Sequence, residues 1–149
     1  MTISLDPFAE QFIKNIKKAG GDFIVVSAGT NYYIDKVFEK HKIKGVTVYS
    51  NKAVYKDKGI HFVLDKENEF YSDIYGIDKY LVVKDLKQKY KYIFYAGDSA
   101  PDLKAALISD TAFAKGKLVE LLKENKKSFV EFDNFSQIWE HVKNILERC

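Results

Sequence analysis

The stretch YIFYAGDSAPDLKAA, residues 92–106, decides the fold class of this chain. Its first part, residues 92–97, is a short apolar run that ends at a glycine, which is typical of a strand buried on both faces of a parallel sheet. The second part, residues 100–109, has the pattern of a helix. Asp98 directly follows the strand, and Asp102 falls in the first turn of that helix. Because ligands bind at the carboxyl ends of strands in open α/β sheets, this turn is a candidate functional site.

Strands and helices alternate along the rest of the chain. Asp6 before Pro7 predicts the start of the first helix, and Gly20 and Gly21 predict its end. The apolar run 23–27 predicts a second buried strand. Further helices are expected over residues 31–41, 77–90, 117–125 and 134–147, strands over 111–115 and 128–132, and a β-hairpin within 45–65 that turns at 57–59.

This alternation predicts an α/β fold, with a Rossmann-like parallel sheet, helices on both faces and a small β-hairpin insertion. A length of 149 residues fits a single domain over residues 1–149.

The composition is that of an ordinary globular protein, with 46% hydrophobic and 30% charged residues. A net charge of +3 with dispersed lysines argues against a nucleic-acid partner. No apolar run is long enough to span a bilayer, and the N-terminus lacks the pattern of a signal peptide. The single cysteine, Cys149, cannot form an internal disulfide, so a cytoplasmic location is expected.

The acidic turn after residue 97 offers two carboxylates. Gly97 would let the backbone turn sharply off the strand, and Asp98 could then hold a hard cation through carboxylate oxygen. Asp102 could accept hydrogen bonds from backbone amides at the start of the helix. The alternative is purely local: Asp98 or Ser99 is a helix N-cap, and Asp102 is an ordinary first-turn acid.

Two further positions could contact a phosphate. Ser27, followed by small residues at the end of a strand, could offer its hydroxyl and successive amides to an anion. The alternative is an ordinary strand-to-helix turn with Thr30 or Asn31 as N-cap.

Lys79 lies at the start of a helix, where the helix dipole disfavours a cation, so it could neutralise a phosphate and a nearby carboxylate. The alternative is a solvated lysine. Lys84, deeper in that helix, is a weaker candidate.

In the order Ser27, Lys79, Asp98, Asp102, these residues resemble motifs II, III and IV of the haloacid dehalogenase superfamily, a group of mostly Mg²⁺-dependent phosphatases. Within it the chain is similar to the phosphoserine phosphatase branch, above all to the methionine-salvage phosphatases that act on 2-hydroxy-3-keto-5-methylthiopentenyl-1-phosphate. The resemblance extends over roughly residues 3–146 and includes the β-hairpin.

The resemblance implies a phosphate-binding role for Ser27, assisted by the amides of Ala28 and Gly29. It implies that Lys79 pairs with the phosphate and the nucleophile. Asn51, in the hairpin, is a weak candidate for contacting the substrate.

For the acidic turn, the resemblance implies that Asp98 holds Mg²⁺ and that Asp102 orients the metal shell or the lysine. The family's nucleophile is the first aspartate of a DxDx[TV] motif that precedes the serine-glycine turn. Here the residues before that turn contain Asp6 and Asp22, and no two aspartates lie two apart. Asp6 is expected to be a helix cap, since Phe8 stands where the second aspartate should be. The first central strand and the helical cap are therefore expected to be missing.

These observations predict a phosphatase-like hydrolase that acts on a small phosphomonoester with Mg²⁺ and is inactive alone. The gap left by a missing strand could be filled by residues 1–5, by direct pairing of the two flanking strands, or by a partner. The partner would be a separate N-terminal fragment or a second copy of this chain. The alternative is a non-catalytic module, derived from such a phosphatase, that binds phosphate, metal or another protein.

Overall fold

The computed structural model describes residues 7–56, 59–63, 71–72 and 76–147 of the chain. The chain divides into two compact units, Met1–Asp78 and Lys79–Cys149. The prediction of a single domain over residues 1–149 stays a prediction.

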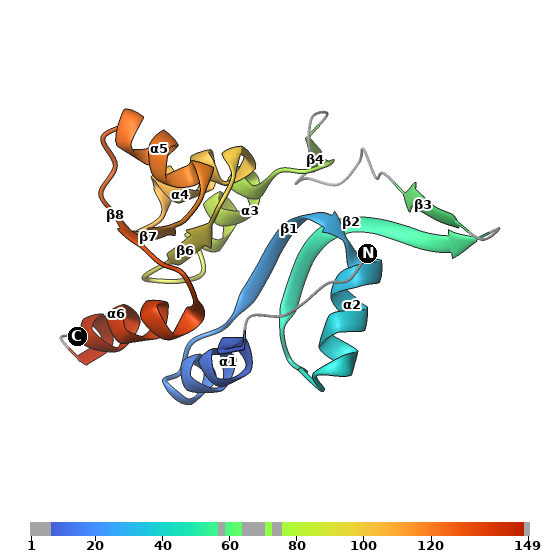
Figure 1. Ribbon diagram of the computed structural model, residues 1–149, viewed down its shortest axis with the longest axis horizontal. Coiled ribbons are helices and arrows are strands. Elements are labelled where there is room, and N and C mark those ends of the chain that lie inside the picture. The colour runs from blue at the N-terminus through green and yellow to red at the C-terminus, as the bar shows by residue number, and fades with distance from the viewer. Residues whose placement is uncertain (1–6, 57–58, 64–70, 73–75, 148–149) are drawn as a thin grey trace. The chain divides into compact units, whose positions relative to one another are not determined.

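The first unit is built around a three-stranded sheet in the order β1-β2-β3 (Figure 1). Strands β1 and β2 are parallel, and β2 and β3 form an antiparallel hairpin in which Lys56 pairs with Gly59. The predicted hairpin is therefore confirmed, with residues 57–58 outside the described part. The elements are α1 (Ala9–Lys18), β1 (Ile24–Thr30), α2 (Asn31–Lys40), β2 (Thr47–Lys56), β3 (Gly59–Val63), and the short paired strands β4 (Tyr71–Ser72) and β5 (Gly76–Ile77).

Helix α1 forms because its apolar residues recur at helical spacing and are buried along one face, as Phe12 and Ile13 are. It starts two residues later than predicted, at Ala9, so Pro7 is not its first residue. Phe8 occupies the N-cap position, and Asp6 lies outside the described residues. The predicted end is confirmed: Gly20 follows the helix with φ of +87°, a conformation that favours glycine.

Strand β1 is longer than predicted. It continues through the serine-glycine segment to Thr30, so Ser27 does not open a strand-to-helix turn. The regular pairing with β2 stops at Val26 and resumes where Thr30 pairs with Asn51. The intervening residues form an irregularity in the strand, which sequence periodicity cannot locate.

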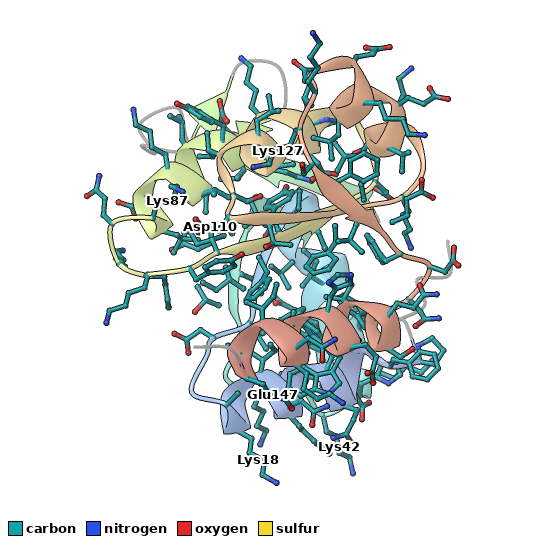
Figure 2. All side chains as sticks on the ribbon, turned by 90° about the vertical axis from the view of Figure 1, so that its left-hand side faces the viewer. Lys18, Lys42, Lys87, Asp110, Lys127 and Glu147 are labelled. Atoms are coloured by element: carbon teal, nitrogen blue, oxygen red, sulfur yellow. The ribbon has the colours of Figure 1, made fainter. Side chains whose placement is uncertain are left out.

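The second unit is a parallel sheet in the order β6-β7-β8 with helices on both faces (Figure 2). Its strands are β6 (Phe94–Gly97), β7 (Thr111–Ala114) and β8 (Phe129–Glu131). Its helices are α3 (Lys79–Leu86), α4 (Leu103–Ile108), α5 (Lys117–Glu124), α6 (Phe135–Glu147) and the 3₁₀ turn η1 (Ala100–Asp102).

The core of this unit lies between the sheet and helices α3, α4 and α5. Its members are mostly small or branched apolar side chains, which let the helices approach the sheet closely: Val83, Tyr95, Ala105, Ala106, Ala112, Ala114, Leu118 and Leu122. On the opposite face, the Phe113 ring lies 6.0 Å from that of His141 in α6. The predicted α/β class, with parallel strands and covering helices, is thus confirmed.

Helix α3 is shorter at both ends than the predicted helix 77–90. Gly76–Ile77 forms strand β5 instead, and the helix stops at Leu86, where the chain turns. Strand β6 begins at Phe94 because the amide of Ile93 is used by the Asp110 carboxylate, at 2.7 Å.

Candidate functional site

The Asp102 carboxylate is the centre of a polar cluster in the second unit. Asp102 ends η1, just beyond the carboxyl end of β6, and its side chain is 4% exposed. Its Oδ1 accepts two hydrogen bonds: Lys79 Nζ donates at 2.7 Å and the Tyr95 hydroxyl donates at 2.6 Å. One buried oxygen therefore joins α3 to β6.

The other oxygen of this carboxylate organises the loop itself. Asp102 Oδ2 accepts hydrogen bonds from the Asp98 amide at 3.0 Å, the Ser99 amide at 3.1 Å and the Ser99 hydroxyl at 3.2 Å. The Ser99 carbonyl in turn accepts from the Asp102 amide. Ser99 is thus the N-cap of η1, and Asp102 is the acid of a capping box. The helix-capping role, which was the alternative to a functional one, and the ion pair with Lys79 therefore coexist, because the Asp102 carboxylate takes part in both.

The pKa of Asp102 is lowered by this environment. Burial alone would raise it, but the hydrogen bonds from Lys79 and Tyr95, the charge of Lys79 and the Asp98 amide outweigh burial. Asp102 is therefore a carboxylate near neutral pH, and its lone pairs are occupied by five donors. It does not have a free oxygen to offer a metal ion directly.

Tyr95 belongs to the site, and the sequence analysis did not single it out. The residue is 7% exposed, and its ring packs in the core beneath the helices. Burial, the nearby charge of Asp102 and the hydrogen bond to Asp102 all raise the pKa of the Tyr95 phenol. It therefore stays protonated and acts as a donor. One signal could have found it: a tyrosine in a buried strand needs a partner for its hydroxyl.

Gly97 is required for a different reason from the one expected. It does not adopt the left-handed conformation that would make glycine necessary for the turn, unlike Gly20, Gly45 and Gly116. Instead, a Cβ at Gly97 would lie 2.5 Å from Asp102 Cγ and 2.7 Å from Oδ2. The absence of a side chain is what lets the carboxylate close over the strand end.

Lys79 is the first residue of α3, so its predicted place at the start of a helix is confirmed, although that helix was expected from residue 77. Its side chain is 12% exposed. The alternative of a solvated lysine is therefore not what the structure shows. Lys84, by contrast, is exposed. Helix α3 carries Lys79 to Asp102 because α3 and α4 pack side by side against the sheet, with Val83 and Ala105 in the shared core.

Asp98 is exposed, and its carboxylate makes no hydrogen bond or ion pair within the described part of the chain. Its chemistry fits Mg²⁺, which prefers oxygen ligands and keeps several waters. Among the residues that the structure describes, however, no three His, Cys, Asp or Glu side chains come together. Asp98 would thus be one ligand, with others from water, a phosphate ester or residues not described.

The remaining candidates lie in the first unit. Ser27 is half-buried within β1, and Ala28 and Gly29 are in the same strand. Asn51 lies in β2, where its backbone pairs with Thr30, and its side chain is outside what the structure describes. The structure therefore brings Lys79, Asp98 and Asp102 together in the second unit. The other four candidates lie in the first unit: Ser27, Ala28, Gly29 and Asn51.

The chain was compared with known proteins, and no family model matches it. It is 26% identical over 139 residues to the 2-hydroxy-3-keto-5-methylthiopentenyl-1-phosphate phosphatase of Bacillus velezensis, covering 91% of this chain and 58% of the relative. It is 27% identical to the Pdp3-interacting factor 1 of Schizosaccharomyces pombe, covering 96% and 65%. The chain thus spans about three fifths of the length of these curated relatives.

A solved structure of cytosolic 5'-nucleotidase IIIB bound to cytidine shares the fold, with a TM-score of 0.61 and 19% identity. The match covers 97% of this chain and 53% of that one. These similarities confirm the resemblance to phosphatases of the haloacid dehalogenase superfamily. Within that class, several of the curated relatives are 2-hydroxy-3-keto-5-methylthiopentenyl-1-phosphate phosphatases.

Proposed function

We propose that the chain carries part of the site of a Mg²⁺-dependent phosphomonoesterase. The observation that carries this proposal is the Lys79 ammonium, held 2.7 Å from the buried Asp102 carboxylate, beyond a strand end where Asp98 is exposed. Phosphoryl transfer depends chiefly on positioning and on neutralising the charge spread over the phosphoryl oxygens. Lys79 would bind such an oxygen, and Asp98 would hold Mg²⁺, which supplies further neutralisation when bound.

Three roles follow from this proposal for other residues. Asp102 would keep Lys79 in place and not bind metal. Ser27 would bind phosphate with the amides of Ala28 and Gly29, and Ser27→Ala should weaken phosphate binding. The substrate would be a small phosphorylated metabolite of the kind named for the relatives, and Asn51 would contact it.

The experiment that tests this proposal is calorimetric titration of the chain with inorganic phosphate in the presence of Mg²⁺. We expect the chain to bind both ligands saturably. Asp98→Asn should abolish binding of Mg²⁺. Lys79→Met should weaken binding of phosphate by about tenfold or more, because one charge-assisted hydrogen bond is lost. Lys84→Met, an exposed lysine on the same helix, is the matched control. No binding of either ligand would refute the proposal.

We further propose that the chain alone does not turn over substrate. The aspartate pair that forms the nucleophile motif of the superfamily does not occur among the residues before Ser27. Hydrolysis of p-nitrophenyl phosphate by this chain alone, lost on Asp98→Asn, would show that the nucleophile is within these 149 residues and would overturn this part.

A second candidate function, strand-mediated protein binding, is favoured by the edge of β6. The carbonyls of Ile93 and Gly97 accept hydrogen bonds from the amides of Thr111 and Lys115 on the β7 side. In a parallel ladder alternate residues bond the same neighbour, so the backbone groups of Phe94 and Ala96 point away from β7. No strand of the described part pairs with that edge.

We propose that a strand from a separate N-terminal fragment, or from a second copy of this chain, binds along this edge. The name of the fission yeast relative, an interacting factor, is consistent with a protein partner. Light scattering after size exclusion tests self-association, and Ala96→Lys should abolish it because a charge blocks strand addition. Glu131→Lys, on the opposite edge strand β8, is the control. If the chain stays monomeric at high concentration, self-association is excluded and a separate N-terminal fragment remains as the proposed partner. A pull-down with the N-terminal part of a relative would test that partner.

A further inference from the structure

The hydrogen bonds to Asp102 are divided unequally between its two oxygens. Oδ2 receives three donors from its own loop, whereas Oδ1 receives Lys79 and Tyr95, which come from α3 and β6. The three loop donors fix the rotation of the carboxylate. The direction in which Oδ1 points is therefore set before Lys79 binds to it.

Charge attraction alone would not place the Lys79 ammonium precisely. A lysine is a compact charge on a flexible four-carbon stem, and its attraction to a carboxylate has little directional preference. The Tyr95 hydroxyl, at 2.6 Å, and the Lys79 ammonium, at 2.7 Å, share Oδ1, so the hydroxyl excludes the ammonium from the position that it occupies itself. Because the Tyr95 ring is packed in the core, the hydroxyl itself has little freedom to move.

Tyr95 also changes how strongly the carboxylate neutralises the lysine. A second donor on Oδ1 shares the negative charge of that oxygen, and hydrogen bonds to an ionised acceptor are about twice as strong as neutral ones. The ammonium consequently keeps more of its attraction for another anion. Both effects favour a lysine that is fixed in place and still able to bind a phosphoryl oxygen.

We propose that Tyr95 is a positioning residue: its hydroxyl, by sharing Oδ1 of Asp102, holds the Lys79 ammonium in the orientation that binds phosphate. The inference rests on the proposed function and identifies a residue that neither the motif resemblance nor the comparisons single out. Tyr95 does not itself contact the phosphate, since its hydroxyl is used by Asp102.

The test compares Tyr95→Phe with Tyr92→Phe. The second is a matched control, because the Tyr92 hydroxyl bonds Thr111 Oγ1 on the neighbouring strand, away from Asp102. The first readout is the ¹⁵N order parameter of the Lys79 ammonium by NMR, which a purely packing role of Tyr95 would not change. The second is the affinity for inorganic phosphate with Mg²⁺.

We expect Tyr95→Phe to lower the order of the Lys79 ammonium and to weaken phosphate binding by about fivefold to tenfold, and Tyr92→Phe to change neither. An unchanged Lys79 signal in Tyr95→Phe would overturn the inference, whatever happens to thermal stability. If the wild-type chain does not bind phosphate, the proposed function fails, and the Lys79 signal still decides the role of Tyr95.

A second measurement covers the case in which Tyr95→Phe does not fold. The wild-type chain is prepared with 3-fluorotyrosine, whose more acidic phenol is a stronger donor and adds little volume. The Lys79 ammonium resonance should then shift, while that of exposed Lys84 stays in place. A Lys79 resonance that does not move would refute the coupling.

Discussion

At the scale of single residues, Asp102 combines two tasks that are usually separate. It closes a capping box at the start of η1 and is the counter-charge of a lysine that is 12% exposed. The first task requires only local sequence, whereas the second requires α3 to pack beside η1. A buried ion pair of this kind is costly to break from one side, because the remaining charge is left without a partner.

Asp102→Asn should therefore destabilise the chain by about 3–5 kcal/mol near neutral pH. The folded pKa of Asp102 lies below the ordinary value of 3.8, so the stability from its charge is present above pH 3.8 and is lost as pH falls through the folded pKa. The difference between wild type and variant in urea unfolding should shrink below pH 3.8. Asp85→Asn, which breaks a surface pair with Lys89, should cost less than about 1 kcal/mol. A difference independent of pH would contradict this account.

Gly97→Ala should disturb the same carboxylate without touching its charge. The added Cβ would overlap Asp102 Cγ at 2.5 Å, so the carboxylate must shift from the position in which it binds Lys79. We expect a loss of about 2–3 kcal/mol, within the range for overpacking, together with a disordered Lys79 ammonium in NMR spectra. Gly20→Ala is the comparison: its cost comes from a φ of +87° alone, with no atom within 4 Å, and it should leave Lys79 unchanged.

At the scale of elements, the C-terminal end of helix α4 is stabilised by hydrogen bonds from lysines that lie outside this helix. Lys87 Nζ donates to the carbonyl of Ile108 at 2.7 Å, and Lys127 Nζ donates to that of Ser109 at 2.9 Å. Lys87 also lies 3.9 Å from the Asp110 carboxylate. Figure 2 labels Lys87, Asp110 and Lys127. Cations at a helix C-terminus satisfy its last carbonyls and complement its dipole.

Lys127→Met should lower the free energy of unfolding by about 1 kcal/mol, because it removes a part-buried hydrogen bond to the carbonyl of Ser109. Lys126→Met is the matched control, since Lys126 is the exposed neighbour in the sequence and should change stability by less than about 0.5 kcal/mol. Chemical denaturation of both variants gives the comparison. Equal effects would mean that net charge, not the helix end, is responsible.

At the scale of the whole molecule, the second unit holds the entire Asp102 cluster and its own core. Lys79, Tyr95, Ser99 and Asp102 all lie within Lys79–Cys149. No helix of the described part is long and apolar enough to cross a membrane.

Residues 79–149, expressed alone, should therefore fold and retain the Lys79–Asp102 pair. A core of this size gives only marginal stability, so we expect a lower melting temperature than that of the full chain. The measurement is an amide NMR spectrum of the fragment, overlaid on that of the full chain. The control is the same fragment with Leu118→Ala, which removes a fully buried core side chain and should destabilise the fold. An unfolded wild-type fragment would show that the unit depends on the rest of the chain.

The sequence alone determined most of the helices and strands and the position of the acidic turn, whereas the short strands β4 and β5 were not predicted. Apolar periodicity, glycines and capping residues act within a few positions, which is why residues 97–102 indicated a helix start with Ser99 as one candidate N-cap and Asp102 in the first turn. The 3₁₀ turn η1 and its capping box were not predicted. The extension of β1 to Thr30 was missed because it depends on pairing with Asn51, 21 positions away in the sequence. The late start of α3 was missed because Gly76–Ile77 pairs with Tyr71–Ser72 and forms a strand instead.

Only the tertiary structure decided how the candidate site is assembled. Lys79 and Asp102 are 23 positions apart, and they meet because α3 packs beside α4 on the sheet that contains Tyr95. No local pattern predicts that Tyr95 and Lys79 share one oxygen, since the distance between their elements is set by the small side chains in the core. The physical reason is that capping is decided by neighbours in sequence, whereas a buried ion pair is decided by how closely two elements pack.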